Sequence, residues 1–157
     1  MKNKDALKLK GKWRYKVIDS LTGKVKRKSD WIENLIVLNS GNGLYIVLSQ
    51  LIGVTTTGIE ITSASIGTDD TAPTIADTDL VTATLEDIPI ALQSRVASDE
   101  VSLTIFINSS ELANGDYKEF GLFCDDKLWA RSIITPTFTK SDNEDFQVEY
   151  SISGSTT

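Results

Sequence analysis

The chain has 157 residues, of which 40% are hydrophobic and 24% are charged, as in a single globular domain that is large enough to bury a core. One cysteine and no histidine exclude an intrachain disulfide framework and remove the commonest metal ligand and general base. Residues 1–30 carry eleven Lys or Arg against three Asp, whereas the remaining residues carry five against nineteen Asp or Glu. This division of the net charge of −6 indicates a basic segment that docks on an acidic protein surface, such as that of another copy, or on nucleic acid.

The N-terminal part is expected to form a basic arm followed by a basic β-hairpin. Residues 1–11 are Lys-rich without clear periodicity and are interpreted as the arm, which leaves residues 12–157 as a single β domain. Basic and apolar residues then alternate in the order Lys12, Trp13, Arg14, Tyr15, Lys16 and Val17. This period of two is typical of a strand with one apolar face, and the turn residues at 19–23 predict that residues 24–29 return as its partner.

The basic face of this hairpin has three interpretations: a solvated surface, a contact with an acidic protein, or a nucleic-acid site. Nucleic acid is the least favoured, because the aromatic residues lie on the opposite face and cannot interleave with the basic ones as a stacking platform requires. Trp13, Arg14 and Lys16 are therefore candidate protein-interface residues.

A turn cluster at residues 39–43 precedes one predicted helix, at about 40–52. Its apolar residues fall at positions i, i+3, i+4 and i+7, namely Leu44, Val47, Leu48 and Leu51. An Asn or Ser of the turn cluster would cap the start of the helix, and Gly53 would follow its end. Because apolar residues also lie outside this stripe, the helix is expected either deep in the core, which is favoured, or covered by another subunit. Leu44, Leu48 and Leu51 are candidate interface residues.

A long polar segment at residues 67–78 follows the strand predicted at 59–66 and is a candidate interaction loop. Its candidate contact residues are Asp69, Asp70, Pro73 and Asp77. The acidic spacing fits no EF-hand loop, and Asp is common in turns, so we predict neither a metal nor any other cofactor.

From residue 88 onward the pattern is β throughout, with strands predicted at 88–96, 101–108, 117–124, 127–135 and 146–153. Together with the N-terminal hairpin and the strand at 59–66, these elements predict a mainly β fold. We expect an antiparallel β-sandwich or flattened barrel of about seven or eight strands, with one short helix.

No residue pattern predicts catalysis. Cys124 has no histidine to serve as its base, so it is interpreted as a small buried residue. Glu119, Arg95 and Arg131 are expected to form ion pairs on or between strands. The sequence contains no phosphate-binding glycine loop, and we predict that the protein is not an enzyme.

Several short motifs resemble those of a recurring family of tailed-bacteriophage structural proteins. In chain order they read LNSGNG, IGTDDTAPTIADTDL, EFGLF, LWAR and FQVEYSIS, and the resemblance covers roughly residues 10–153. One departure is Asp69-Asp70, where the family tends to have Gly-Thr. The resemblance implies a non-enzymatic assembly module of the tail, baseplate or fibre-attachment region, in a homo-oligomer and in contact with other virion proteins.

Two alternatives remain open. A capsid decoration or head-fibre protein would use the same fold on the shell lattice. A carbohydrate- or receptor-binding module would gather exposed aromatic residues, for which Trp31, Trp129 and Tyr117 are the candidates. The start of the chain lacks the apolar core of a signal peptide, and the longest apolar run, 44–52, is too short for a membrane span. The expected location is the virion, after synthesis in the host cytoplasm.

Overall fold

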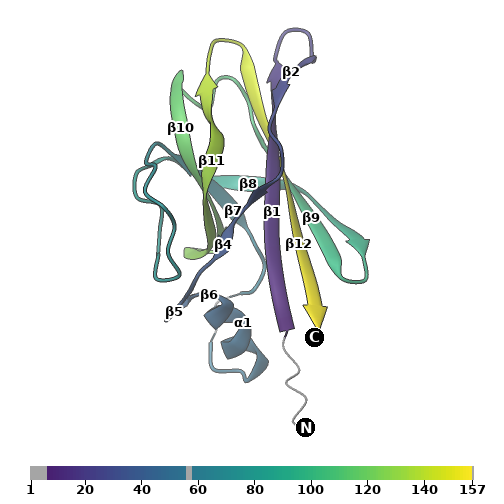
Figure 1. Ribbon diagram of the computed structural model, residues 1–157, viewed down its shortest axis with the longest axis vertical. Helices are drawn as coiled ribbons and strands as arrows, with labels where there is room; N and C mark the ends of the chain where they lie inside the picture. The colour runs from purple at the N-terminus through teal and green to yellow at the C-terminus, as the bar shows by residue number, and fades with distance from the viewer. Residues whose placement is uncertain (1–6, 56–57, 157) are drawn as a thin grey trace.

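The computed structural model describes residues 7–55 and 58–156 (Figure 1). The chain is mainly β and antiparallel with one short helix, as predicted. The first elements are β1 (Leu7–Asp19), β2 (Val25–Lys28), β3 (Ile32–Glu33), β4 (Leu35–Ile36), β5 (Leu38–Asn39), β6 (Asn42–Gly43) and α1 (Leu44–Leu51). The remaining elements are β7 (Ser63–Gly67), β8 (Ala83–Ala97), β9 (Glu100–Ile107), β10 (Gly115–Cys124), β11 (Lys127–Lys140) and β12 (Glu144–Thr156).

One continuous curled sheet, a half-barrel, replaces the predicted sandwich or flattened barrel of about seven or eight strands. Nine strands follow the order β2-β1-β12-β9-β8-β7-β10-β11-β4, and β3 pairs separately with β1. In Figure 1, β1, β12 and β9 lie on one side and β10 and β11 on the other, with β7 and β8 behind them. The sandwich prediction is wrong because β8 has 15 residues and joins the two sides, pairing with β7 through its first half and with β9 through its second.

Residues 32–36 span the opening of the half-barrel. Ile32 lies opposite Trp13 in the β1–β3 pairing, and Leu35 lies opposite Arg131 in the β4–β11 pairing. One extended segment thus contacts strands from both sides of the sheet. It positions β11 close to β1, although these two strands are not paired with each other.

Aromatic side chains from both sides of the sheet fill the interior. The rings of Trp13 and Phe120 stack with centroids 4.8 Å apart, and those of Phe138 and Phe146 stack at 4.3 Å. Such pairs add directional stabilisation to the burial of apolar area. The alternation in β1 is confirmed, since its apolar residues face this core.

The predicted boundary of the N-terminal arm is wrong. Residues 7–11 continue β1 and pair with residues 152–156 of β12. The rest of the predicted arm, residues 1–6, lies outside the described residues.

The end of α1 forms as predicted. Gly53 has φ of 70°, its N–H donates to the carbonyl of Gln50 (3.1 Å), and the N–H of Val54 donates to the carbonyl of Ser49 (3.0 Å). These two bonds form a Schellman motif, which favours glycine because the left-handed conformation is strained with a Cβ atom.

The start of α1 differs from the prediction. Its N-cap is Gly43, with φ of 54° and no side-chain cap. A Cβ atom at Gly43 would overlap the backbone of Val37. The side chain of Asn42, an expected cap, instead accepts the N–H of Leu128 (3.0 Å) and so holds the β5–β6 hairpin against β11. No helix in the described ranges is long and apolar enough to cross a membrane.

Candidate interaction surfaces

A buried ion pair holds the polar loop at residues 68–82 against the β10–β11 hairpin. Arg131 donates from Nε (3.0 Å) and Nη2 (2.9 Å) to Oε2 of Glu119, and both side chains are fully buried. Nη1 of Arg131 reaches Oδ2 of Asp77 (3.0 Å), and Nη2 also donates to the carbonyl of Thr71 (2.9 Å). A guanidinium presents its N–H donors in a fixed planar fork, so Arg131 can bind several acceptors at once.

Glu119 also binds the far end of the loop. Its two carboxylate oxygens accept the backbone N–H groups of Val81 (3.0 Å) and Thr82 (2.7 Å). The carboxylate is therefore satisfied both by a cation and by backbone donors, as a buried charge requires.

Hydrogen bonds also hold Asp77 and the neighbouring residues of the loop. Burial alone would raise the pKa of Asp77, but hydrogen bonds from Thr74 and Arg131 lower it below its ordinary value. On the other side of the loop, Nδ2 of Asn39 donates to the carbonyl of Ala76 (2.6 Å). The segment is long but has many fixed contacts, so it presents a defined surface.

The remaining predicted loop residues have local structural contacts. Asp69 accepts the N–H of Thr71 (2.7 Å), and Asp70 forms an exposed ion pair with Lys118 (3.1 Å). Pro73 is half-buried. No group of three or more Asp, Glu or Cys that could hold a metal ion lies among the residues that the structure describes.

The predicted ion-pair role is confirmed for Glu119 and Arg131. For Arg95, no ion pair is found within the described ranges. The bond between Arg131 and Asp77 was not predicted, because 54 residues separate the two and no local pattern links them.

The face of α1 that points away from the core is apolar. Only Ile46 and Ser49 of the helix are buried, whereas Leu48 and Leu51 are 51% and 76% exposed. The favoured prediction of a helix deep in the core is therefore wrong, because aromatic residues of the strands already fill the interior. Leu44, the third candidate on α1, is half-buried and lines a small apolar cavity of about 220 Å³ beside Leu38 and Ile75.

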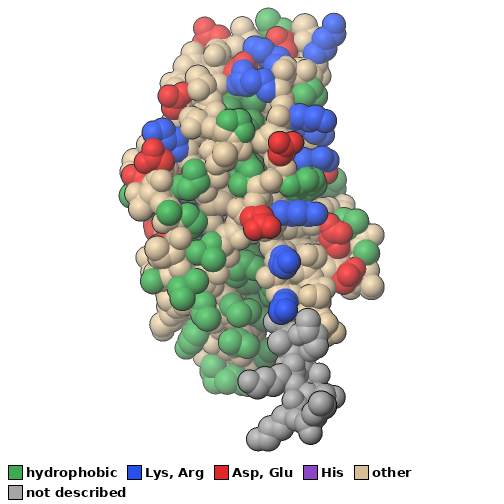
Figure 2. Space-filling model, viewed as in Figure 1, with side chains coloured by type: hydrophobic (Ala, Val, Ile, Leu, Met, Phe, Trp, Pro, Cys, Tyr) green, Lys and Arg blue, Asp and Glu red, His purple; other side chains and the backbone are tan. Residues whose placement is uncertain are grey.

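Exposed apolar residues of neighbouring segments extend this face. We call the combined set the α1 apolar surface; it comprises Leu38, Tyr45, Leu48, Leu51, Ile52, Val54 and Ile75. Figure 2 shows hydrophobic side chains gathered over the end of the molecule that carries α1 and β5. Ile75 belongs to the loop held by Arg131, and its carbonyl accepts the N–H of Leu38 (2.8 Å). The loop and the helix thus contribute to one surface.

A row of lysines follows the outward face of β1 and continues onto β2. We call it the lysine row; it comprises Lys8, Lys10, Lys12, Lys16 and Lys28, and Figure 2 shows it as a column of basic side chains. Arg14 lies within the row but is paired with Glu149 (2.7 Å). Lys12 and Arg14 also lie over the ring of Trp31, at 4.8 Å and 4.6 Å from its centroid. Arg14 and Lys16 are accessible, as an interface role requires.

Trp13 is different, and its selection as an interface residue is wrong. Its side chain is 0% exposed, and its Nε1 donates to Oγ of Ser132 on β11 (2.6 Å). A partner of the folded protein cannot contact it.

Among the described residues, the three candidate aromatic side chains do not form the exposed cluster expected of a carbohydrate-binding module. Trp129 and Tyr117 are buried, and Trp31 alone of the three candidates is exposed. Cys124 is buried as predicted, and burial together with Asp125 raises the pKa of its thiol to about 12. A thiol with that pKa holds its proton at neutral pH and is a poor nucleophile.

Comparison with known proteins identifies no relative: no protein-family model, curated protein or solved structure matches this chain. The expected resemblance to tailed-phage virion proteins therefore rests on short motifs alone. Residues from two of those motifs, IGTDDTAPTIADTDL and EFGLF…LWAR, meet at the Glu119–Arg131 pair.

Proposed function

We propose that this chain is a non-enzymatic structural component of a tailed-bacteriophage virion, in the tail, baseplate or fibre-attachment region, and that its copies associate through the α1 apolar surface. The observation that carries the proposal is the exposure of this surface. Monomeric proteins rarely leave large apolar side chains gathered in one exposed patch, and such patches are typical of interaction sites.

The held loop supports an assembly role. Arg131 and Asn39 fix the segment that carries Ile75, so its position on the surface is set before a partner arrives. A preformed surface loses less conformational entropy on binding than a flexible loop does. The motif resemblance supports the virion as the setting, because its most extended motif is the sequence of this loop.

A pair of substitutions on α1 tests the proposal. Leu48→Lys/Leu51→Lys keeps the helix, since Lys and Leu have similar helix propensities, but places two charges on the apolar face. Losing the burial of two leucines weakens association by roughly 3 kcal/mol or more, about 100-fold in Kd. Sedimentation velocity in about 0.5 M salt, which screens contacts between surface charges, should show wild-type protein at a multiple of 17.2 kDa and the variant at 17.2 kDa.

The matched control is Leu92→Lys/Val96→Lys on β8, whose residues are similarly exposed at 60% and 59%. This control should keep the wild-type mass. Circular dichroism checks that both variants are folded. A folded α1 variant with the wild-type mass, or equal losses in both variants, would contradict the role of the α1 apolar surface.

A further inference from the structure

The lysine row contains charges that form no ion pair within the described ranges, although Lys16 lies near enough to Glu149 to help lower the pKa of that carboxylate. Lys16 and Lys28 lie directly opposite each other in the β1–β2 pairing, and no carboxylate there forms an ion pair with either. Like charges at directly opposite positions destabilise a sheet. By contrast, the neighbouring Lys26 and Arg27 both pair with Glu144, at 2.7 Å and 3.2 Å.

Protection of a sheet edge does not explain the whole row. Lysines on an edge strand discourage unwanted strand pairing, and this reason accounts for Lys28 on β2. Lys12 and Lys16, however, lie where β1 is paired on both sides, with β12 on one side and with β3 or β2 on the other. Glu33 lies opposite Lys12 in the β1–β3 pairing, but no ion pair joins the two within the described ranges, so both lysines remain available to a partner with negative charge.

The chain itself carries a complementary surface. Carboxylates gather around a hollow of about 210 Å³ between β7, β8 and the β10–β11 turn, and they belong to Asp79, Glu86, Asp87, Asp125 and Asp126. We call it the carboxylate hollow. Within the described ranges, Asp126 is the one member of this set that pairs with a cation, Lys127 (2.9 Å). All five carboxylate residues are exposed and available to a partner.

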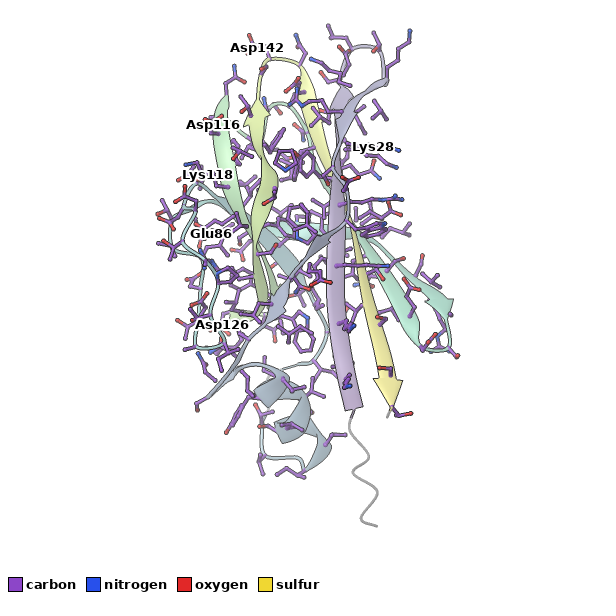
Figure 3. All side chains as sticks on the ribbon, viewed as in Figure 1. Lys28, Glu86, Asp116, Lys118, Asp126 and Asp142 are labelled. Carbon is purple, nitrogen blue, oxygen red and sulfur yellow. The ribbon has the colours of Figure 1, made fainter. Side chains whose placement is uncertain are left out.

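The two surfaces lie on opposite sides of the molecule. Figure 3 shows Lys28 on one side and Glu86 and Asp126 on the other. A single copy therefore cannot bring its own lysine row to its own carboxylate hollow. Contact between such surfaces on different copies is head-to-tail and generates a ring or an open line.

We propose that the lysine row of one copy docks on the carboxylate hollow of the next copy. This inference shares with the proposed function only the premise that copies associate, and it concerns a different surface. A second copy fits better than nucleic acid, because the chain has a net charge of −6 and the large aromatic residues of β1 face inward.

Two charge-reversal variants test this contact. Lys12→Glu/Lys16→Glu replaces two of the five positive charges of the lysine row by negative ones, and Glu86→Lys/Asp126→Lys replaces two of the five negative charges of the carboxylate hollow by positive ones. Each variant alone should associate about tenfold more weakly than wild type at low salt, because the attraction between its two surfaces is largely lost. An equimolar mixture should be heavier than either variant alone, since the unchanged lysine row of one variant meets the unchanged carboxylate hollow of the other.

Salt and the α1 variant separate this contact from the α1 apolar surface. The contact between charges should weaken as salt rises from about 0.02 M to 0.5 M, where screening is strong. With Leu48→Lys/Leu51→Lys added to both charge-reversal variants, the mixture should still be heavier than either protein alone. That recovery would hold even if the α1 proposal failed.

Two results would overturn the inference. One is a mixture no heavier than its separate components. The other is a pair of observations that favours nucleic acid as the partner. Wild-type protein would bind a 20-base-pair DNA duplex through Lys12 and Lys16 with steep salt dependence, and Glu86→Lys/Asp126→Lys would have the same mass in solution as the wild type.

Discussion

Nη2 of Arg131 lies 2.9 Å from Oε2 of Glu119, and neither side chain is more than 1% exposed. The pair sits on β10 and β11, yet most of its other hydrogen bonds go to the loop at 68–82. We therefore expect the folded loop and the buried pair to stabilise each other. The fixed loop, in turn, holds Ile75 within the α1 apolar surface.

Removing one member of the pair should destabilise the protein strongly. Arg131→Met leaves the carboxylate of Glu119 buried without its cation, and such a loss costs about 3–5 kcal/mol in the free energy of unfolding. Urea denaturation measures it. Asp70→Asn, which breaks only the exposed pair with Lys118, is the control and should cost less than about 1 kcal/mol. Similar effects of the two changes would contradict the importance of the buried pair.

Gly67 should tolerate no side chain. A Cβ atom there would overlap the carbonyl oxygen of Thr82 and lie 2.6 Å from Oε1 of Glu119. Gly67→Ala should therefore cost about 1–3 kcal/mol, because the carbonyl belongs to the backbone and both groups are held by the loop. Gly58→Ala is the control, since the nearest atom to its Cβ would be 3.7 Å away. The midpoint temperatures of thermal unfolding of the two variants are compared. Equal midpoints would show that the loop can move to make room for the added Cβ atom.

The stability of the folded protein should fall in acid, because the carboxylate of Glu144 becomes protonated. Burial alone would raise the pKa of Glu144, but hydrogen bonds from Lys26, Ser141 and Arg27 lower it to about 2, against 4.5 for an ordinary glutamate. Because the folded pKa is the lower one, the stabilisation is complete above about pH 5 and is lost as pH falls from 4.5 towards 2.

The variant Glu144→Gln tests this pH dependence. It should lower the free energy of unfolding by about 2 kcal/mol at pH 7, since it replaces bonds to a charged acceptor, and the deficit should shrink towards pH 2. Urea midpoints at pH 7, 5 and 3 give the comparison. Asp30→Asn, on an exposed residue, should follow the wild type at each pH. A deficit that is constant with pH would exclude the ionisation of Glu144 as its cause.

The two tryptophans near β1 should differ sharply. Trp13→Ala removes a fully buried ring and its bond to Ser132, and large-to-small changes of this kind cost about 3–5 kcal/mol. Trp31→Ala removes an exposed ring and should cost about 1 kcal/mol or less. Guanidinium denaturation measures both changes in the free energy of unfolding. The unfolding is followed by circular dichroism, because removing a tryptophan changes the fluorescence signal. Comparable costs would show that Trp13 is not part of the core.

Local patterns predicted the local elements well. The alternation from Lys12 to Val17 fixes which face of β1 is buried, and Gly53 ends α1 because its position needs a left-handed backbone. Charge type led us to expect an ion-pair role for Glu119 and Arg131, but the same reasoning also gave Arg95, which forms no ion pair within the described ranges. Trp13 could also have been placed correctly, since the same alternation puts it on the apolar face.

Long-range features could not be predicted in this way. The burial of α1 depends on whether the strands leave space inside the sheet, and the sequence of the helix does not contain that information. The change of partner along β8 depends on two other strands, β7 and β9. The contact of Asp77 with Arg131 requires the hairpin and the loop to be folded already.

The mass of the wild-type chain in solution tests the central claim most directly. Light scattering should be recorded over a range of protein concentrations at low and at high salt. An assembly module that buries the α1 apolar surface should have a mass of at least twice 17.2 kDa, and should keep part of that association at high salt because apolar contacts are not screened. A mass of 17.2 kDa at every concentration and salt would contradict the proposal that copies of this chain assemble.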